Sequence, residues 1–97
     1  MKLFRIWQEV NNGYDTYDSA IVAAESDEQA RITSVCEYMR LEFDESEDSW
    51  MRTMDDGSKR KDDNWSWAHP KHVQVEYIGE AKEGTEKGVI LASFNAG

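Results

Sequence analysis

The chain has 97 residues, with twenty acidic side chains against eleven basic ones and a formal net charge of −9. Such a charge disfavours binding to DNA, RNA or an anionic membrane surface, because phosphate groups would be repelled. A hydrophobic fraction of 39% predicts a single globular domain over residues 1–97, and no apolar run approaches the ~20 residues of a membrane-spanning helix.

Residues 2–10 are predicted to form the first strand, because apolar residues alternate along them. The Asn12-Gly13 pair that follows predicts a tight hairpin turn, since both central positions of the favoured turn require positive φ. A second strand is then expected from about Tyr17 to Ala24.

A two-residue turn at Asn12-Gly13 fixes the register of this hairpin. The predicted pairs are Leu3 with Val22, Phe4 with Ile21, Ile6 with Ser19 and Trp7 with Asp18. Apolar side chains then lie on both faces, so one face is expected to pack on a helix. The other face, which carries Trp7, is expected to meet a further element or a partner.

A helix is predicted from about Asp27 to Phe43. Ser26 and Gln29 fit a capping box, and acidic residues in the first turn suit the positive end of the helix dipole. The apolar residues recur at helical spacing, at positions Ile32, Val35, Cys36, Met39 and Phe43.

Residues 44–67 break this pattern, since they are dense in charge and have little periodicity. We predict a charged insertion or mobile loop here, with one short helix on which Trp50, Met51 and Met54 share a side. The alternating pattern resumes in residues 72–81. There Val73, Val75 and Tyr77 alternate with polar residues, which predicts a half-buried strand.

The run Val89–Phe94 predicts a last strand with two apolar faces. The element order is then β-β-α-β-β, which indicates an α+β fold: an antiparallel sheet of about four strands with one main helix packed on one face. The expected core residues are Phe4, Ile6, Ile21, Val35, Met39, Val75, Ile90 and Phe94.

Three phrases, NNGYDTYDSAIVAAES, VEYIGEA and GVILASFNAG, resemble a family of short phage and prophage proteins of unknown function. The resemblance covers roughly the first 31 and the last 25 residues. It implies a phage-encoded accessory protein in the cytoplasm of a bacterial host. Small phage accessory proteins of this kind include inhibitors of host defence such as anti-CRISPR proteins, which implies that class of function here.

Candidate metal sites are weak. His69 and His72 lie three residues apart near Asp62 and Asp63, but Pro70 disfavours a helix that would align the two imidazoles. A calcium-loop pattern begins at Asp44, yet its sixth and twelfth positions hold Ser49 and Asp55 in place of the usual Gly and Glu. We therefore expect no metal and no cofactor.

An enzymatic role is not expected either. The sequence has no glycine-rich phosphate loop and no Ser-His-Asp arrangement that can be placed. The single cysteine, Cys36, falls in the apolar stripe of the predicted helix and cannot form an internal disulfide, which predicts a reduced cytoplasmic protein.

The acids are concentrated in one segment. Residues 42–56 hold seven acids and one base, Arg52. We predict a partner-binding surface in which Trp50 is the anchor and the charge comes from Glu42, Asp44, Glu45, Glu47, Asp48, Asp55 and Asp56. Carboxylates arrayed in this way can occupy a site made for phosphates, which predicts an inhibitor of a basic, nucleic-acid-handling host protein.

A second hypothesis belongs to a different class. Here the chain is a small structural or assembly protein that forms a homodimer through the Trp7 face of the hairpin. The charge then serves only solubility.

Overall fold

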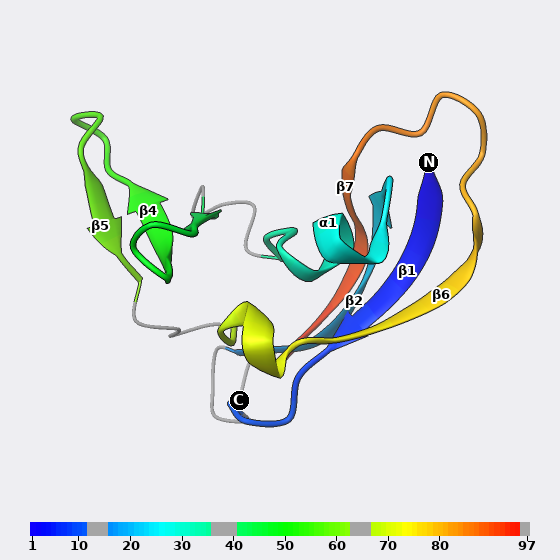
Figure 1. Cartoon of the computed structure of the whole chain (residues 1–97), viewed down its shortest axis with the longest axis horizontal. Helices are drawn as coiled ribbons and strands as arrows, with labels where there is room; N and C mark the ends of the chain where they lie inside the picture. Colours follow the sequence, from blue (N-terminus) through cyan, green and yellow to red (C-terminus); the bar gives the residue numbers. More distant parts are fainter. Residues whose placement is uncertain (12–15, 36–40, 63–66, 96–97) are drawn as a thin grey trace.

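The computed structural model describes residues 1–11, 16–35, 41–62 and 67–95. In chain order the elements in these ranges are β1 (Lys2–Trp7), β2 (Thr16–Ala24), α1 (Asp27–Arg31), β3 (Leu41–Asp44), β4 (Ser49–Thr53), β5 (Lys59–Lys61), the 3₁₀ helix η2 (Pro70–His72), β6 (Gln74–Glu80) and β7 (Gly88–Asn95). The strands form two antiparallel sheets, with α1 beside the larger one (Figure 1).

The larger sheet has four strands in the order β6-β1-β2-β7. These are the four strands predicted from the sequence, the first three from alternation and the last from the apolar run 89–94, so the prediction of a four-stranded antiparallel sheet is confirmed. On the two central strands, the side chains of one face are buried and pack into a common core: Phe4, Ile6, Ala20, Val22 and Ala24. The outer strands are less covered on this face, since Tyr77 of β6, opposite Phe4, is 54% exposed.

The register of the first hairpin differs from the prediction by one residue. Phe4 pairs with Val22 and Ile6 with Ala20, where Ile21 and Ser19 were expected. A slip of one residue moves every side chain of a strand to the opposite face. Ile21 therefore lies on the face away from the core, and the predicted turn residues Asn12 and Gly13 lie outside the described ranges.

The predicted main helix is wrong in length. Its start is confirmed, since the Ser26 hydroxyl accepts a hydrogen bond from the Gln29 amide at 3.2 Å. The helix ends at Arg31: the Thr33 amide donates to the Ala30 carbonyl, three residues back, at 3.2 Å, and the Thr33 hydroxyl donates to the Gln29 carbonyl at 2.7 Å. The fold is accordingly mostly β rather than α+β with a main helix.

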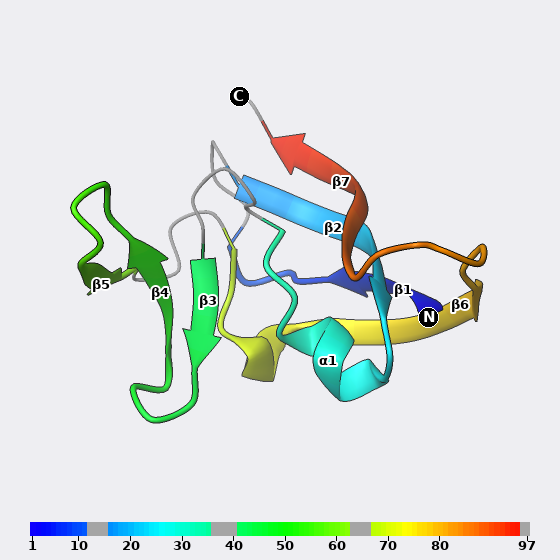
Figure 2. The ribbon, with the colours of Figure 1, turned by 90° about the horizontal axis from the view of Figure 1, so that it is seen from above.

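The segment expected to be a charged insertion holds the second sheet, in the order β3-β4-β5. Trp50 and Met51 lie on β4 rather than on a short helix. The sheet's inner face places Leu41, Phe43 and Trp50 against the same core as the larger sheet. Figure 2 shows the two sheets on either side of the chain that follows α1.

The predicted core is partly confirmed. Phe4, Ile6 and Val35 are buried, and Val75 packs against the buried cluster. The prediction of Ile90 as a core residue is wrong. Its side chain is 53% exposed, and the register between β2 and β7 skips this residue at a bulge. Ile21 is only half-buried and lies outside the core cluster, while Met39 and the Phe94 side chain lie outside the described part of the chain.

The face of the larger sheet away from the core keeps an apolar character. It carries Trp7, with the Arg5 guanidinium 4.3 Å from the centre of its ring system, and Leu91, which is 68% exposed. The predicted homodimer through this face stays a prediction. Within the described ranges, none of the helices is long and apolar enough to cross a membrane.

Candidate functional site

Four of the predicted acids lie together in the turn that joins β3 to β4, and we call this turn the acidic tip: Asp44, Glu45, Glu47 and Asp48. The Asp44 carboxylate shapes it. Its Oδ1 accepts from the Ser46 amide at 2.9 Å, the Ser46 hydroxyl at 2.6 Å and the Glu47 amide at 3.2 Å. The tip therefore holds its charges on an ordered turn.

Asp48 completes the tip from its other side. Its φ of 51° lies in the left-handed region, which Asp tolerates better than most residues. His69 Nε2 donates to Asp48 Oδ1 at 2.8 Å, because His69 Nδ1 is occupied as the acceptor of the Lys71 amide at 3.0 Å. The sequence suggested His69 only as a weak metal ligand, whereas here it ties the tip to the segment before η2.

Hydrogen bonding lowers the pKa of Asp44 below its ordinary value, with the Ser46 hydroxyl as the main cause and the Glu47 amide next. The Ser58 hydroxyl lowers the pKa of Asp56 in the same way in the turn between β4 and β5. Both carboxylates are thus fully ionised at neutral pH.

Replacing Ser46 with Ala is expected to raise the pKa of Asp44 towards its ordinary value, since the main donor to the carboxylate is lost. A depressed pKa adds stability above the unfolded-state pKa and loses it as pH falls through the folded-state value, so the variant's deficit should vanish in acid. Carboxyl NMR titration of the wild type and the variant measures the change in the Asp44 pKa directly.

Ser58→Ala is the matched control for Ser46→Ala, because it removes the same kind of contact from Asp56. It should shift the Asp56 titration and leave Asp44 unchanged. An Asp44 titration that is identical in wild type and Ser46→Ala would refute the assignment of the hydroxyl as the cause.

Two lysines of β5 reduce the charge beside the tip, which the sequence analysis did not anticipate. Lys61 Nζ lies 3.6 Å from Glu47 Oε2, and Lys59 Nζ lies 3.9 Å from Glu42 Oε2. The pairing follows from the register, which places Glu42, Met51 and Lys61 on one face of the smaller sheet. Glu42 and Glu47 are therefore partly compensated.

The predicted surface does not form one patch. Asp55 and Asp56 lie in the turn at the opposite end of β4 from the acidic tip. A five-residue strand spans roughly 17 Å, so these two acids cannot join the tip in a single small contact. The structure brings together five of the seven acids, with Glu42 next to the tip.

Trp50 does not fit the predicted role of an exposed anchor. It is 1% exposed, and its Nε1 donates to the Ala68 carbonyl at 2.8 Å. Its ring packs edge-to-face on Phe43, with 5.5 Å between the ring centroids. An indole in the core offers no surface to a partner, so we assign Trp50 to packing.

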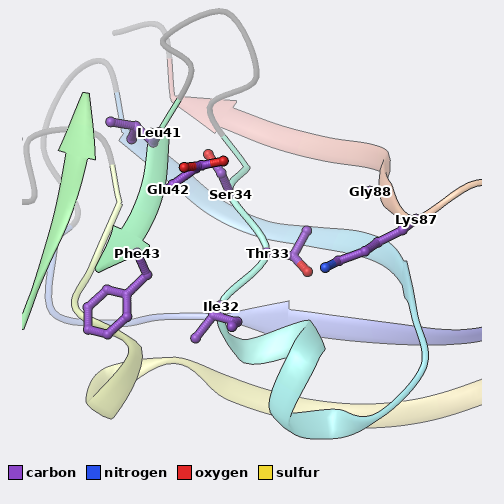
Figure 3. Close-up of a pocket in the computed structure, with 8 residues that line it drawn as sticks. All are labelled: Ile32, Thr33, Ser34, Leu41, Glu42, Phe43, Lys87 and Gly88. Carbon is purple, nitrogen blue, oxygen red and sulfur yellow. The ribbon is translucent and has the colours of Figure 1, made fainter. Parts of the chain in front are cut away.

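A groove beside β3 was not foreseen from the sequence. It has a volume of about 500 Å³ and lies between β3, the loop after α1 and the start of β7 (Figure 3). Its lining residues are Ile32, Thr33, Ser34, Leu41, Glu42, Phe43, Lys87 and Gly88. A second hollow of about 360 Å³ shares Glu42 and Phe43 and adds Asp44 and Glu45 of the tip.

Across the ranges that the structure describes, no three His, Cys, Asp or Glu side chains gather in a group that could hold a metal ion. His72, the second imidazole of the weak metal candidate, is exposed at the end of η2. The described site offers a cluster of carboxylates beside a groove with both apolar and polar lining residues.

Comparison with known proteins identifies no relative: no protein-family model, curated protein or solved structure matches the chain. The resemblance to short phage and prophage proteins stays a prediction.

Proposed function

We propose that this protein is an acidic binding protein that inhibits a basic, nucleic-acid-handling protein of a bacterial host by occupying its nucleic-acid site. The observation that carries the proposal is the acidic tip, where four carboxylates lie within five consecutive residues on a hydrogen-bonded turn. The phage origin and the inhibitory role rest on the sequence resemblance.

The geometry of the tip suits this role. Figure 2 shows the turn between β3 and β4 at one end of the smaller sheet. The side chain of Asp48 is 80% exposed and that of Glu47 is 49% exposed, so both present charge to a partner. Clustered carboxylates attract a phosphate-binding surface and speed association, and salt weakens that effect.

The test uses the variant Glu45→Gln/Glu47→Gln, which removes two charges and leaves the Asp44 and Asp48 contacts of the turn in place. Immobilised wild-type protein captures a basic protein from bacterial lysate, and association of the purified partner is then timed at low and physiological salt. We expect the variant to associate roughly 2- to 10-fold more slowly at low salt, with a smaller difference at physiological salt.

Glu83→Gln/Glu86→Gln is the matched control, because it removes the same net charge from exposed positions between β6 and β7. Equal slowing by both double variants would mean that only net charge matters. Nucleic acid should also compete with the wild-type protein for the captured partner. A partner that binds both at once contradicts occupation of the nucleic-acid site.

A further inference from the structure

The groove beside β3 runs along an outer edge of the smaller sheet. The order β3-β4-β5 makes β3 an outer strand, and the groove is lined by its residues 41–43 on one side and by Ile32, Thr33 and Ser34 on the other. Figure 3 shows these two walls facing each other, with Lys87 and Gly88 beyond Thr33.

The backbone of β3 has hydrogen-bonding groups to offer on this side. In an antiparallel strand, alternate residues direct N–H and C=O groups away from the paired neighbour. Within the described ranges, no other strand pairs with β3 on its outer side, and no loop backbone bonds to residues 41–44. The edge can therefore accept one more strand.

The side chains beside this edge alternate in character. Leu41 and Phe43 belong to the inner face, next to Ile32, whereas Glu42 and Asp44 belong to the outer face. An added strand alternates its side chains in the same way. Its inward side chains would meet an apolar floor, and its outward ones would meet the carboxylates.

The charged residues that line the groove and the adjoining hollow indicate which kind of segment can bind there. The two adjoining hollows present the carboxylates of Glu42, Asp44 and Glu45 against the ammonium groups of Lys59 and Lys87. Lys87 Nζ lies beside Thr33 in Figure 3 and donates a hydrogen bond to Gln29 Oε1 at 3.1 Å. Glu42 already pairs with Lys59, but carboxylates outnumber ammonium groups in the two hollows. A basic segment therefore fits beside Asp44 and Glu45 better than an acidic one or a second copy of this acidic chain.

We infer that β3 and its groove bind an extended segment of the basic partner by strand addition, with apolar and basic side chains alternating along the segment. The inference rests on the proposed function and names its recognition mode. Main-chain hydrogen bonds to β3 contribute affinity, and the alternating pockets give specificity.

The test uses three short acetylated peptides in which Lys and Val alternate: one unmodified, one N-methylated at every Lys and one N-methylated at every Val. In a strand, all side chains on one face belong to residues whose N–H groups point to the same neighbour. Strand addition therefore predicts that one methylated peptide binds about tenfold more weakly or worse, while the other keeps its affinity.

Amide NMR shifts locate the bound peptide and should move in residues 32–34 and 41–43. Ile32→Arg, which places a cation in the groove, should weaken the unmodified peptide, whereas Ile90→Arg on the exposed bulge of β7 should not. A peptide alternating Glu and Val should leave the spectrum unchanged.

Equal affinity of both methylated peptides, or shifts along β7 in place of β3, would overturn the inference. So would a rise in molecular mass with protein concentration that Ile32→Arg abolishes, because a second copy would then fill the groove. The acidic-tip experiment remains independent: slowed association by Glu45→Gln/Glu47→Gln with no peptide asymmetry retains the proposed function and rejects strand addition.

Discussion

Replacing Trp50 with Ala is expected to lower the free energy of unfolding by about 3–5 kcal/mol, as for other large aromatic side chains removed from a core. Trp50 is among the largest fully buried side chains and lies in the cluster that includes Phe4 and Val22 of the larger sheet. A domain of this size has a total stability of about 5–15 kcal/mol, so the variant should be close to unfolding.

Urea unfolding followed by circular dichroism measures this loss, and two variants separate its causes. Trp50→Phe keeps an aromatic ring but leaves the Ala68 carbonyl without its indole donor, which should cost about 1–3 kcal/mol. Trp7→Ala is the comparison for a half-buried tryptophan on the other face, where the guanidinium contact and partial burial predict a loss of about 1 kcal/mol.

A loss for Trp50→Ala that is no larger than the loss for Trp7→Ala would contradict the placement of Trp50 in the core. The result also bears on function. If Trp50→Ala weakens partner binding only in proportion to the folded fraction, the prediction that Trp50 contacts the partner is wrong.

The strands of the larger sheet could be predicted because their burial follows the two-residue period of a pleated strand. The register could not. Asn12-Gly13 favours a two-residue turn, yet the observed pairs of Phe4 with Val22 and Ile6 with Ala20 place one more residue between the strands. The small side chains of Ala20 and Ala24 suit the crowded core face, and that preference depends on packing that a hairpin pattern does not contain.

The length of the helix could not be predicted from periodicity alone. Ser26 marks its start through a local hydrogen bond, and that signal is visible in the sequence. Its end is set by Ile32 and Thr33, which are β-branched and weak helix formers, while Phe43 recurs at helical spacing although it lies on β3. An apolar residue three or four positions on is compatible with either element.

The smaller sheet was missed because its strands are short and carry polar inner residues. Arg52 shares the inner face of β4 with Trp50, and β5 consists of Lys59, Arg60 and Lys61. Neither strand alternates cleanly between apolar and polar residues. The acids of the tip could be found by counting charge, but the lysines that compensate Glu42 and Glu47 depend on this unpredicted register.

Arg52→Met is expected to lower the free energy of unfolding by about 3 kcal/mol. This is the lower end of the range for breaking a buried ion pair by removing one partner. Arg52 Nη2 lies 3.1 Å from Asp62 Oδ1 in the structure. The Asp62 side chain is 1% exposed and that of Arg52 is 38% exposed, so the change leaves a buried carboxylate without its guanidinium. Because Arg52 is partly exposed, the expected loss of stability stays below the upper end of that range.

The position of Asp62 makes this cost hard to relieve. The Asp62 amide donates to the Trp50 carbonyl at 2.9 Å, so the backbone holds the residue beside β4 just after β5 ends. The main chain at this residue cannot move out towards water without breaking that bond. Chemical denaturation of the single variants and of Arg52→Met/Asp62→Leu gives the coupling energy between the two side chains.

Arg52→Met/Asp62→Leu should be more stable than Arg52→Met alone, because apolar residues of similar volume replace a buried pair at little cost. Lys61→Met is the matched control: its pair with Glu47 is about half exposed on both sides and should contribute less than about 1 kcal/mol. If Arg52→Met costs no more than Lys61→Met, the pair contributes only as a surface contact. The burial of Asp62 would then be offset by its remaining contacts rather than by Arg52.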